Sequence, residues 1–113
     1  MSENKKSVPV PPAITARQKK FLKGLAHPLS ALVHIGKDGI SQGILDTVSA
    51  ELSNHELVKV KIGSNSSVEK HSTSQAVADQ TGSSLVQLIG KTFILYKRNL
   101  KKPKDKRIQL PKG

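Results

Sequence analysis

The sequence predicts one α/β domain in which helices pack on a parallel or mixed β-sheet. Helix-like segments, with apolar residues three or four positions apart, alternate with short strand-like runs. Residues 57–62 alternate apolar and polar side chains, and the last two strand-like runs are separated by the turn residues Gly90 and Lys91. A chain of 113 residues suffices for one compact core and is too short for two.

The first helix is predicted over about residues 16–26. Thr15 and Gln18 fit a capping box at its start, and Pro28 ends it because the residue before a proline avoids helical angles. Apolar residues at helical spacing define the predicted core side: Ile14, Phe21, Leu22 and Leu25. Basic residues define an opposite, cationic side: Arg17, Lys19, Lys20 and Lys23.

A buried strand is predicted over residues 31–35, directly before Gly36. The second helix, over about residues 41–53, has Ser41 as its cap. Its apolar residues stand about one helical turn apart: Ile44, Leu45, Val48 and Leu52. In the strand predicted over residues 57–62, the aliphatic side chains face the core, so Lys59 and Lys61 are expected on an uncovered face of the sheet.

The third helix follows a loop at residues 63–66. Ser66 and Glu69 offer a capping box at its start, and Gly82 closes it. Strands are then predicted over residues 85–89 and 92–96, joined by the Gly90-Lys91 turn as a hairpin. The domain is expected to cover residues 14–97. Residues 1–13 are predicted to be a disordered arm and residues 98–113 a basic tail, and the run of residues 97–104 is expected to be too charged to pack.

Positive charge dominates the composition. Nineteen Lys and Arg against eight Asp and Glu give a net charge of +11 and a pI near 10.2. Eight of these basic residues, and one acidic residue, fall within residues 97–113. A small protein with this field is expected to bind a polyanion.

Several classes of protein do not fit the sequence. No cysteine is present, and no apolar run approaches the length of a membrane span, so we expect a cytoplasmic protein without a membrane partner. The histidines have no metal-ligand spacing: His27, His34, His55 and His71. Leu85 stands where a P-loop ending in Gly90-Lys91-Thr92 requires glycine. No catalytic constellation is recognisable, and we expect neither enzymatic activity, nor a cofactor, nor a bound metal.

The Gly36-Lys37-Asp38-Gly39 segment lies between a predicted strand and a predicted helix. A glycine at each end allows backbone N–H groups to approach a ligand, and the following helix directs its positive end the same way. This G-x-x-G arrangement is typical of loops that hold a nucleotide backbone. The alternative is a tight turn that needs glycine only for its backbone angles. Lys37 is expected to contact phosphate, whereas Asp38 is expected to serve the turn or the helix cap.

Four blocks of sequence together resemble the CRM domain, the chloroplast RNA splicing and ribosome maturation module. They are residues 18–29 (QKKFLKGLAHPL), 36–40 (GKDGI), 55–61 (HELVKVK) and 86–92 (VQLIGKT). Residues 107–112 (RIQLPK) are similar to the ending of its stand-alone, YhbY-like bacterial members. Two features depart from the family pattern: the polar residues 71–74 in the third helix, and the extra lysines of the tail.

The resemblance implies an α-β-α-β-α-β-β fold with a mixed four-stranded sheet, similar to the C-terminal domain of translation initiation factor three. It also implies RNA as the partner, and for stand-alone members the ribosomal RNA of large-subunit precursors. We expect a monomer that binds RNA through Gly36–Gly39 and an adjoining basic surface. That surface consists of Arg17, Lys19, Lys20, Lys23, Lys91, Lys97 and Arg98.

Four alternatives remain open from the sequence. The cationic side of the first helix is also the pattern of a solvated surface helix. The protein could bind nucleic acid without selectivity through its tail alone, or bind introns as a splicing factor. An enzyme acting on RNA is the fourth alternative.

Overall fold

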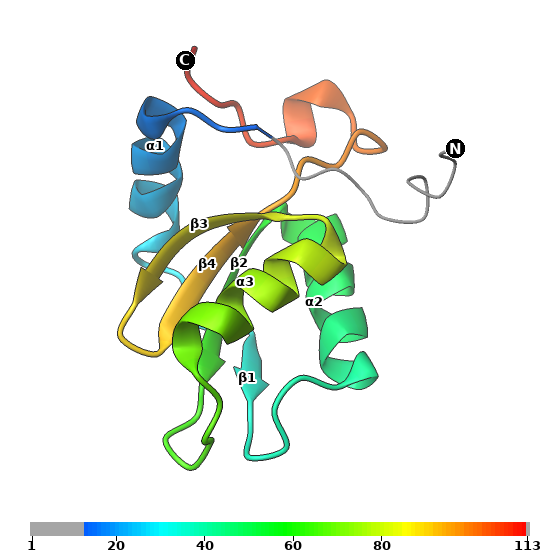
Figure 1. The fold of residues 1–113 in the computed structure, drawn as a ribbon. Coiled ribbons are helices and arrows are strands. Elements are labelled where there is room, and N and C mark those ends of the chain that lie inside the picture. Colours follow the sequence, from blue (N-terminus) through cyan, green and yellow to red (C-terminus); the bar gives the residue numbers. More distant parts are fainter. Residues whose placement is uncertain (1–12, 113) are drawn as a thin grey trace, which may run out of the picture.

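The computed structural model describes residues 13–112 (Figure 1). Its elements run in the following order: α1 (Ala16–Ala26), β1 (Val33–Ile35), α2 (Gln42–His55), β2 (Leu57–Ile62), α3 (Lys70–Thr81), β3 (Ser84–Ile89), β4 (Thr92–Tyr96) and a short 3-10 helix (Lys104–Lys106). The predicted α-β-α-β-α-β-β order is confirmed. Apart from Ala13, the predicted disordered arm lies outside the described residues.

The four strands form one mixed sheet in the order β1-β2-β4-β3. β1 and β2 are parallel, with Ile35 opposite Ile62, and α2 makes the crossover between them. β4 lies antiparallel between β2 and β3, so the final hairpin closes the sheet. The predicted mixed four-stranded sheet is therefore confirmed.

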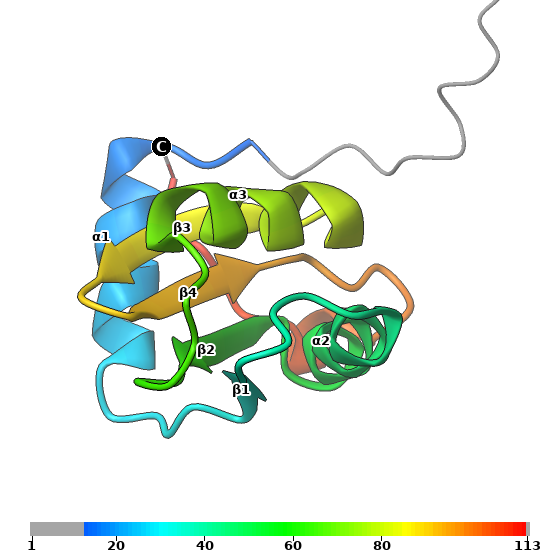
Figure 2. The same ribbon diagram turned by 60° about the horizontal axis from the view of Figure 1, so that its bottom comes forward.

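Helices cover both faces of this sheet (Figure 2). α2 and α3 pack on one face, around a core that contains Ile35, Val48, Val77 and Phe93. α1 packs on the other face, over a second core that includes Leu22, Ala26, Leu57, Ile94 and Tyr96. The face that carries Lys59 and Lys61 was expected to be uncovered. That expectation was wrong for the part under α1, and it holds for exposed Lys61.

α1 has the predicted bounds and capping box: the Thr15 Oγ1 atom accepts from the Gln18 N–H, and the Thr15 N–H donates to Gln18 Oε1. Its buried side differs from the prediction. Leu22 and Ala26 are fully buried, whereas Phe21 is 39% and Leu25 40% exposed. Residues four apart fall on nearly one line of a helix, and it is the line through Leu22 and Ala26 that faces the sheet.

α3 begins one turn later than its predicted cap. The Glu69 carboxylate, not Ser66, accepts the N–H groups of His71 and Ser72. The helix nevertheless packs well, because its buried hydroxyl groups bond to its own backbone. Ser74 Oγ donates to the His71 carbonyl, and Thr81 Oγ1 to the Val77 carbonyl. A polar helix can thus be buried without losing hydrogen bonds.

The C-terminal tail packs on the domain, and the prediction that residues 97–104 are too charged to pack was wrong, since Lys97, Asn99 and Lys102 bond to the domain. Ile108 and Leu110 lie against the core under α1. The N–H groups of Asn99 and Ile108 donate to the carboxylate of Glu56, which is completely buried. Gln18 Nε2 donates to the Pro111 carbonyl at 2.8 Å. Ile108, Leu110 and parts of the tail backbone are held, while Leu100 and most of the lysine side chains of the tail stay exposed.

Candidate nucleic-acid interface

Residues 36–39 form a tight turn between β1 and α2. The Gly39 N–H donates to the Gly36 carbonyl at 3.1 Å, and this bond leaves Lys37 and Asp38 exposed at the tip. Gly39 is buried with φ at +73°, and an added Cβ would lie 3.1 Å from Cγ1 of Val68. Gly36 has open space around the position of a Cβ. The fold therefore requires glycine at 39, and Gly36 is free of that requirement.

α2 begins close behind this turn. Ser41 is its cap, as predicted, with Oγ accepting from the Ile44 N–H at 3.2 Å. Asp38 was expected in the turn or the cap, and the structure places it in the turn. Within the described residues, the N–H groups of Gln42 and Gly43 have no acceptor. Two unpaired donors and the positive end of the helix dipole thus follow the G-x-x-G turn.

A second loop, residues 63–67, lies beside the first. The Gly63 N–H donates to the Ile35 carbonyl at 2.8 Å, and the Ser66 N–H to the Gly63 carbonyl at 3.0 Å. These bonds leave Ser64, Asn65 and Ser67 exposed. The sequence predicted this segment as a loop but gave no sign of its neighbour, because the contact depends on the parallel pairing of β1 with β2.

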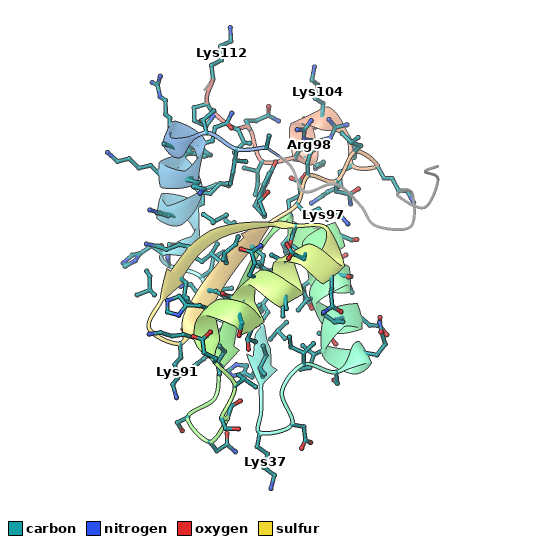
Figure 3. All side chains as sticks on the ribbon, in the orientation of Figure 1. Lys37, Lys91, Lys97, Arg98, Lys104 and Lys112 are labelled. Atoms are coloured by element: carbon teal, nitrogen blue, oxygen red, sulfur yellow. The ribbon has the colours of Figure 1, made fainter. Side chains whose placement is uncertain are left out.

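The β3–β4 turn reaches the same end of the sheet, since the Ile62 N–H donates to the Lys91 carbonyl at 2.7 Å. We call this the loop end; it comprises residues 36–39, 63–67 and 90–91 (Figure 1). Lys37 and Lys91 both extend into solvent there (Figure 3). Exposed Lys61 and His34 are cross-strand neighbours just behind it. Three lysines and one histidine therefore lie at or beside the loop end.

The predicted basic residues of α1 are all exposed: Arg17, Lys19, Lys20 and Lys23. None of them has a carboxylate partner among the described residues. They belong to the α1 face of the sheet, and Lys23, in the last turn, borders a pocket that reaches the β3–β4 hairpin. The structure thus connects α1 to the loop end through Lys23.

Lys97 and Arg98 lie at the opposite end of the sheet, together with Lys104 and Lys112 (Figure 3). The Lys97 ammonium group donates to the Thr81 carbonyl at 2.9 Å and so completes the end of α3. Arg98 is exposed. The structure therefore separates these two predicted site residues from the Gly36–Gly39 turn. We call this region the tail end.

Two further lysines bond to backbone carbonyls. Lys59 Nζ donates to the carbonyls of His27 and Leu29, just beyond the end of α1. Lys102 Nζ donates to the Asn54 carbonyl in the last turn of α2. Cations are favourable at the carbonyl ends of helices. These partners lie about 30 and 48 residues away in the chain, so no local sequence signal identifies the two lysines as structural.

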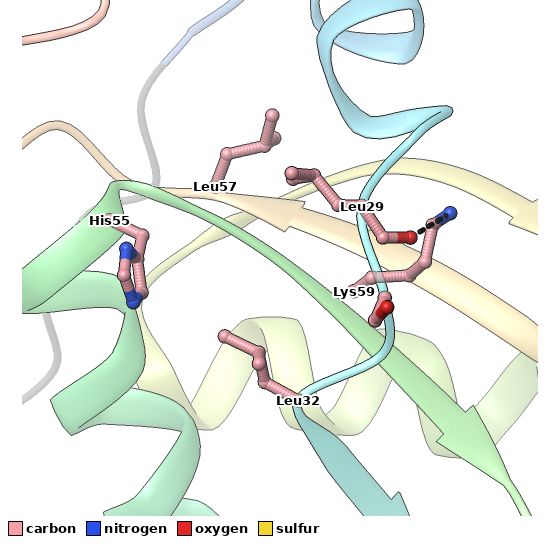
Figure 4. Close-up of a pocket in the computed structure, with 6 residues that line it drawn as sticks. Leu29, Leu32, His55, Leu57 and Lys59 are labelled. Atoms are coloured by element: carbon pink, nitrogen blue, oxygen red, sulfur yellow. Dashed lines mark hydrogen bonds between the residues drawn. The ribbon is translucent and has the colours of Figure 1, made fainter.

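An apolar pocket near α1 lies apart from the loop end (Figure 4). It has a volume of about 380 Å³ and is lined by Leu29, Leu32, His55, Leu57 and Lys59, with Ser30. Its one lysine already bonds to the Leu29 carbonyl, as the dashed line shows. Without an uncommitted cation, this pocket has little to attract a polyanion.

Two ionisable groups are perturbed. Backbone hydrogen bonds from His71 and Ser72 lower the pKa of Glu69 from 4.5 to about 2, so this carboxylate is ionised at neutral pH. Burial, with the nearby charge of Glu56, raises the pKa of Tyr96 above its usual 10.0.

Within residues 13–112, no cluster of three His, Cys, Asp or Glu side chains is arranged to hold a metal ion. No helix in the described part of the chain is long and apolar enough to cross a membrane.

Comparison with known proteins gives a consistent result. The CRS1 / YhbY (CRM) domain family matches residues 14–97. An RNA-binding protein of Haemophilus influenzae is 35% identical over 99 residues, which cover 88% of this chain and 96% of that protein. The probable RNA-binding protein YqeI of Bacillus subtilis is 34% identical over 98 residues, 87% of this chain and 99% of the relative.

A solved structure is also similar. The solution structure of a hypothetical protein from Staphylococcus aureus, for which RNA binding has been suggested, superposes with a TM-score of 0.72 at 33% identity. The superposition covers 88% of this chain and all of that one.

Proposed function

This chain belongs to the CRS1 / YhbY (CRM) domain family, and we propose that it is an RNA-binding protein that holds its ligand at the loop end. The observation that carries the proposal is the exposed Gly36-Lys37-Asp38 tip. Gly36 has open space where a side chain would be, and Lys37 extends into solvent beside it. A phosphate can approach the bare backbone at Gly36 while the Lys37 ammonium group neutralises its charge.

The rest of the RNA track is proposed to run over Lys91 and the exposed cations of α1. Lys97 and Arg98 are too far from the loop end to continue this track, so we assign them, with the tail lysines, to a second contact region. Binding then comes mainly from charge. For single-stranded RNA, each neutralised phosphate contributes about −0.7 to the slope of log K against log salt, so roughly four to six contacts predict a slope of about −3 to −4.

The experiment that tests the loop compares Lys37→Glu with wild type in salt-dependent binding to ribosomal RNA fragments. We expect the variant to bind at least about tenfold more weakly, with a shallower salt slope, since a repulsive charge replaces a phosphate contact. Ala50→Glu serves as the control, because it also adds a negative charge but lies at an exposed position of α2, outside both proposed contact regions. Unchanged affinity in Lys37→Glu would refute the loop as the binding site.

The rival, binding through the tail alone, needs a variant that keeps the tail folded. Deletion is unsuitable because Ile108 and Leu110 pack against the core under α1. Neutralising the exposed lysines instead, by K101Q, K104Q, K106Q and K112Q, preserves the backbone bonds to Glu56. We expect this variant to retain its preference for structured RNA over DNA and to lose only overall affinity.

We further propose that the RNA is the ribosomal RNA of large-subunit precursors and that the protein acts as a cytoplasmic monomer without catalysis. Crosslinking in cells, followed by sequencing of the bound RNA, tests the ligand. Predominance of introns or messenger RNA would redirect the proposal to splicing or to general binding. Incubation of the protein with ribosomal RNA and a divalent metal tests catalysis, and we expect no cleavage.

A further inference from the structure

A second pocket lies between the end of α1 and the β3–β4 hairpin, on the α1 face of the sheet. Its volume is about 260 Å³. The residues that matter here line it from three elements: Lys23 and His27 from the end of α1, Gln87 and Ile89 from β3, and Thr92 and Ile94 from β4. The pocket has an apolar base and a polar rim.

The base and one wall of the pocket are aliphatic. Ile94 is buried and forms part of the core under α1, while Ile89, at the edge strand, is 59% exposed. An isoleucine so exposed at the mouth of a pocket offers apolar area that water covers poorly. A flat ring placed here would bury both surfaces.

Two polar side chains of the pocket are uncommitted. The amide of Gln87 and the hydroxyl of Thr92 are half-buried, and neither has a hydrogen-bond partner within residues 13–112. Together they present donors and acceptors beside an aliphatic surface. The edge of a nucleobase is recognised by such groups, while its face packs on apolar side chains.

The charges around the pocket have one sign. Lys23 borders it, Lys91 directly precedes Thr92, and Lys61 is the cross-strand neighbour of Thr92. No acidic residue lines the pocket. The negatively charged backbone next to a bound base would therefore be attracted. This favours a nucleotide of RNA over a cationic or neutral ligand.

A row of paired residues across the sheet connects the pocket to the loop end. His34, Lys61, Thr92 and Ile89 pair in register from β1 to β3 and form one row across the sheet. β1 leads into the Gly36 turn two residues after His34. With strands about 4.8 Å apart, the row spans on the order of 15 Å from the G-x-x-G side to the pocket.

We propose that this pocket holds one unpaired base of an RNA strand whose backbone is bound at the loop end. The inference rests on the RNA-binding function proposed above and adds a base-reading site to it. Gln87 and Thr92 contact the edge of the base, Ile89 and Ile94 its face, and Lys23 an adjoining phosphate. The protein would then distinguish unpaired from paired RNA at this position, because a paired base cannot enter.

The experiment measures the binding of short single-stranded RNAs by fluorescence anisotropy with the full chain. The probes are hexamers of A, of C and of U, and a hexamer of the same backbone without bases. We expect wild type to bind at least one of the three about tenfold more tightly than the abasic strand. Gln87→Met, which keeps the length of the side chain but removes the amide, should reduce that ratio to about twofold and leave abasic binding unchanged.

Controls separate the possible failures. Gln80→Met makes the same change at an exposed position of α3, on the other face of the sheet, and should keep the wild-type ratio. Thr92→Val removes the hydroxyl from a strand residue of the same shape and should also lower the ratio. Lys37→Glu should weaken binding of all probes equally.

A wild-type ratio retained in Gln87→Met and Thr92→Val would overturn the base-reading site, and so would equal affinity of wild type for based and abasic strands. In either case, weakening by Lys37→Glu would show that the proposed RNA-binding function stands. If Lys37→Glu instead bound every probe as tightly as wild type, the loop would be refuted as the RNA site.

Discussion

The buried carboxylate of Glu56 accepts a hydrogen bond from the backbone N–H of Ile108 at 2.7 Å, 52 residues further along the chain. Its other oxygen accepts from the Asn99 N–H at 2.6 Å. Glu56 ends α2 in the left-handed conformation, with φ at +64°. A residue whose backbone conformation has a cost of its own therefore holds the basic tail at two points, Asn99 and Ile108.

Glu56→Gln should lower the free energy of unfolding by about 2 kcal/mol, because the amide keeps one acceptor oxygen and loses one charge-assisted bond. Urea unfolding measures the loss. Amide hydrogen exchange should show the change concentrated near Asn99 and Ile108. Glu51→Gln, on the same helix at a partly exposed position, is the control and should change the free energy by less than about 0.5 kcal/mol.

The two glycines of the G-x-x-G turn should behave differently. Gly39→Ala should destabilise the fold by about 1–2 kcal/mol, since φ is +73° and Val68 lies 3.1 Å from the new Cβ. Gly36→Ala should leave stability within about 0.5 kcal/mol of wild type while weakening RNA binding, because the added methyl obstructs only a ligand. Urea unfolding and anisotropy of the same samples test both. If Gly36→Ala bound RNA with unchanged affinity, this would contradict the proposal that a phosphate approaches the protein backbone at Gly36.

Glu69 should make stability depend on acid. Its folded-state pKa, about 2, is below the ordinary 4.5, so its contribution is complete above 4.5 and is lost as the pH falls through the folded value. The urea midpoint of Glu69→Gln should therefore be lower than that of wild type at about pH 5, and the two should converge towards about pH 2. A constant difference over this range would contradict the assignment.

Tyr96 should ionise only above its usual range. The chain has one tyrosine and no tryptophan, so its ultraviolet absorbance reports this residue alone. Burial and the charge of Glu56 raise its pKa, so Glu56→Gln should shift the titration back towards 10.0. The stabilisation from the neutral phenol is complete below 10.0 and is lost as the pH rises through the folded pKa. A wild-type midpoint at or below 10.0 would show that the phenol is not buried as described.

Local patterns predicted most of the fold. Capping residues and alternation gave α1, α2 and β2 to within two residues at each end, since short-range hydrogen bonds and side-chain spacing determine these elements. The side of α1 that faces the sheet could not be read, because Phe21 and Leu25 are as apolar as Leu22. Which row is buried depends on the surface it meets.

The packing of the tail was hidden for a related reason. Ile108 and Leu110 stand among charged residues, and their partners are distant in the sequence. A phosphate contact at Gly36–Gly39 was predicted from the sequence and stays a prediction, whereas the segments that surround this turn could not be predicted. Residues 63–67 lie beside the Gly36–Gly39 turn, and Lys97 bonds to the Thr81 carbonyl. Both contacts join separate elements of the fold, so no local sequence pattern predicts them.

The bond between Gln18 and Pro111 spans 93 of the 113 residues. A ribosome delivers this chain from its first residue to its last, so α1 emerges long before the tail that packs beside it. The layer beneath α1 can be completed only after synthesis is nearly finished, whereas the last residue of the opposite core is Leu95. Maturation of the nascent protein should therefore proceed in two stages, and a ribosome stalled within the final segment would carry a domain closed on one side only.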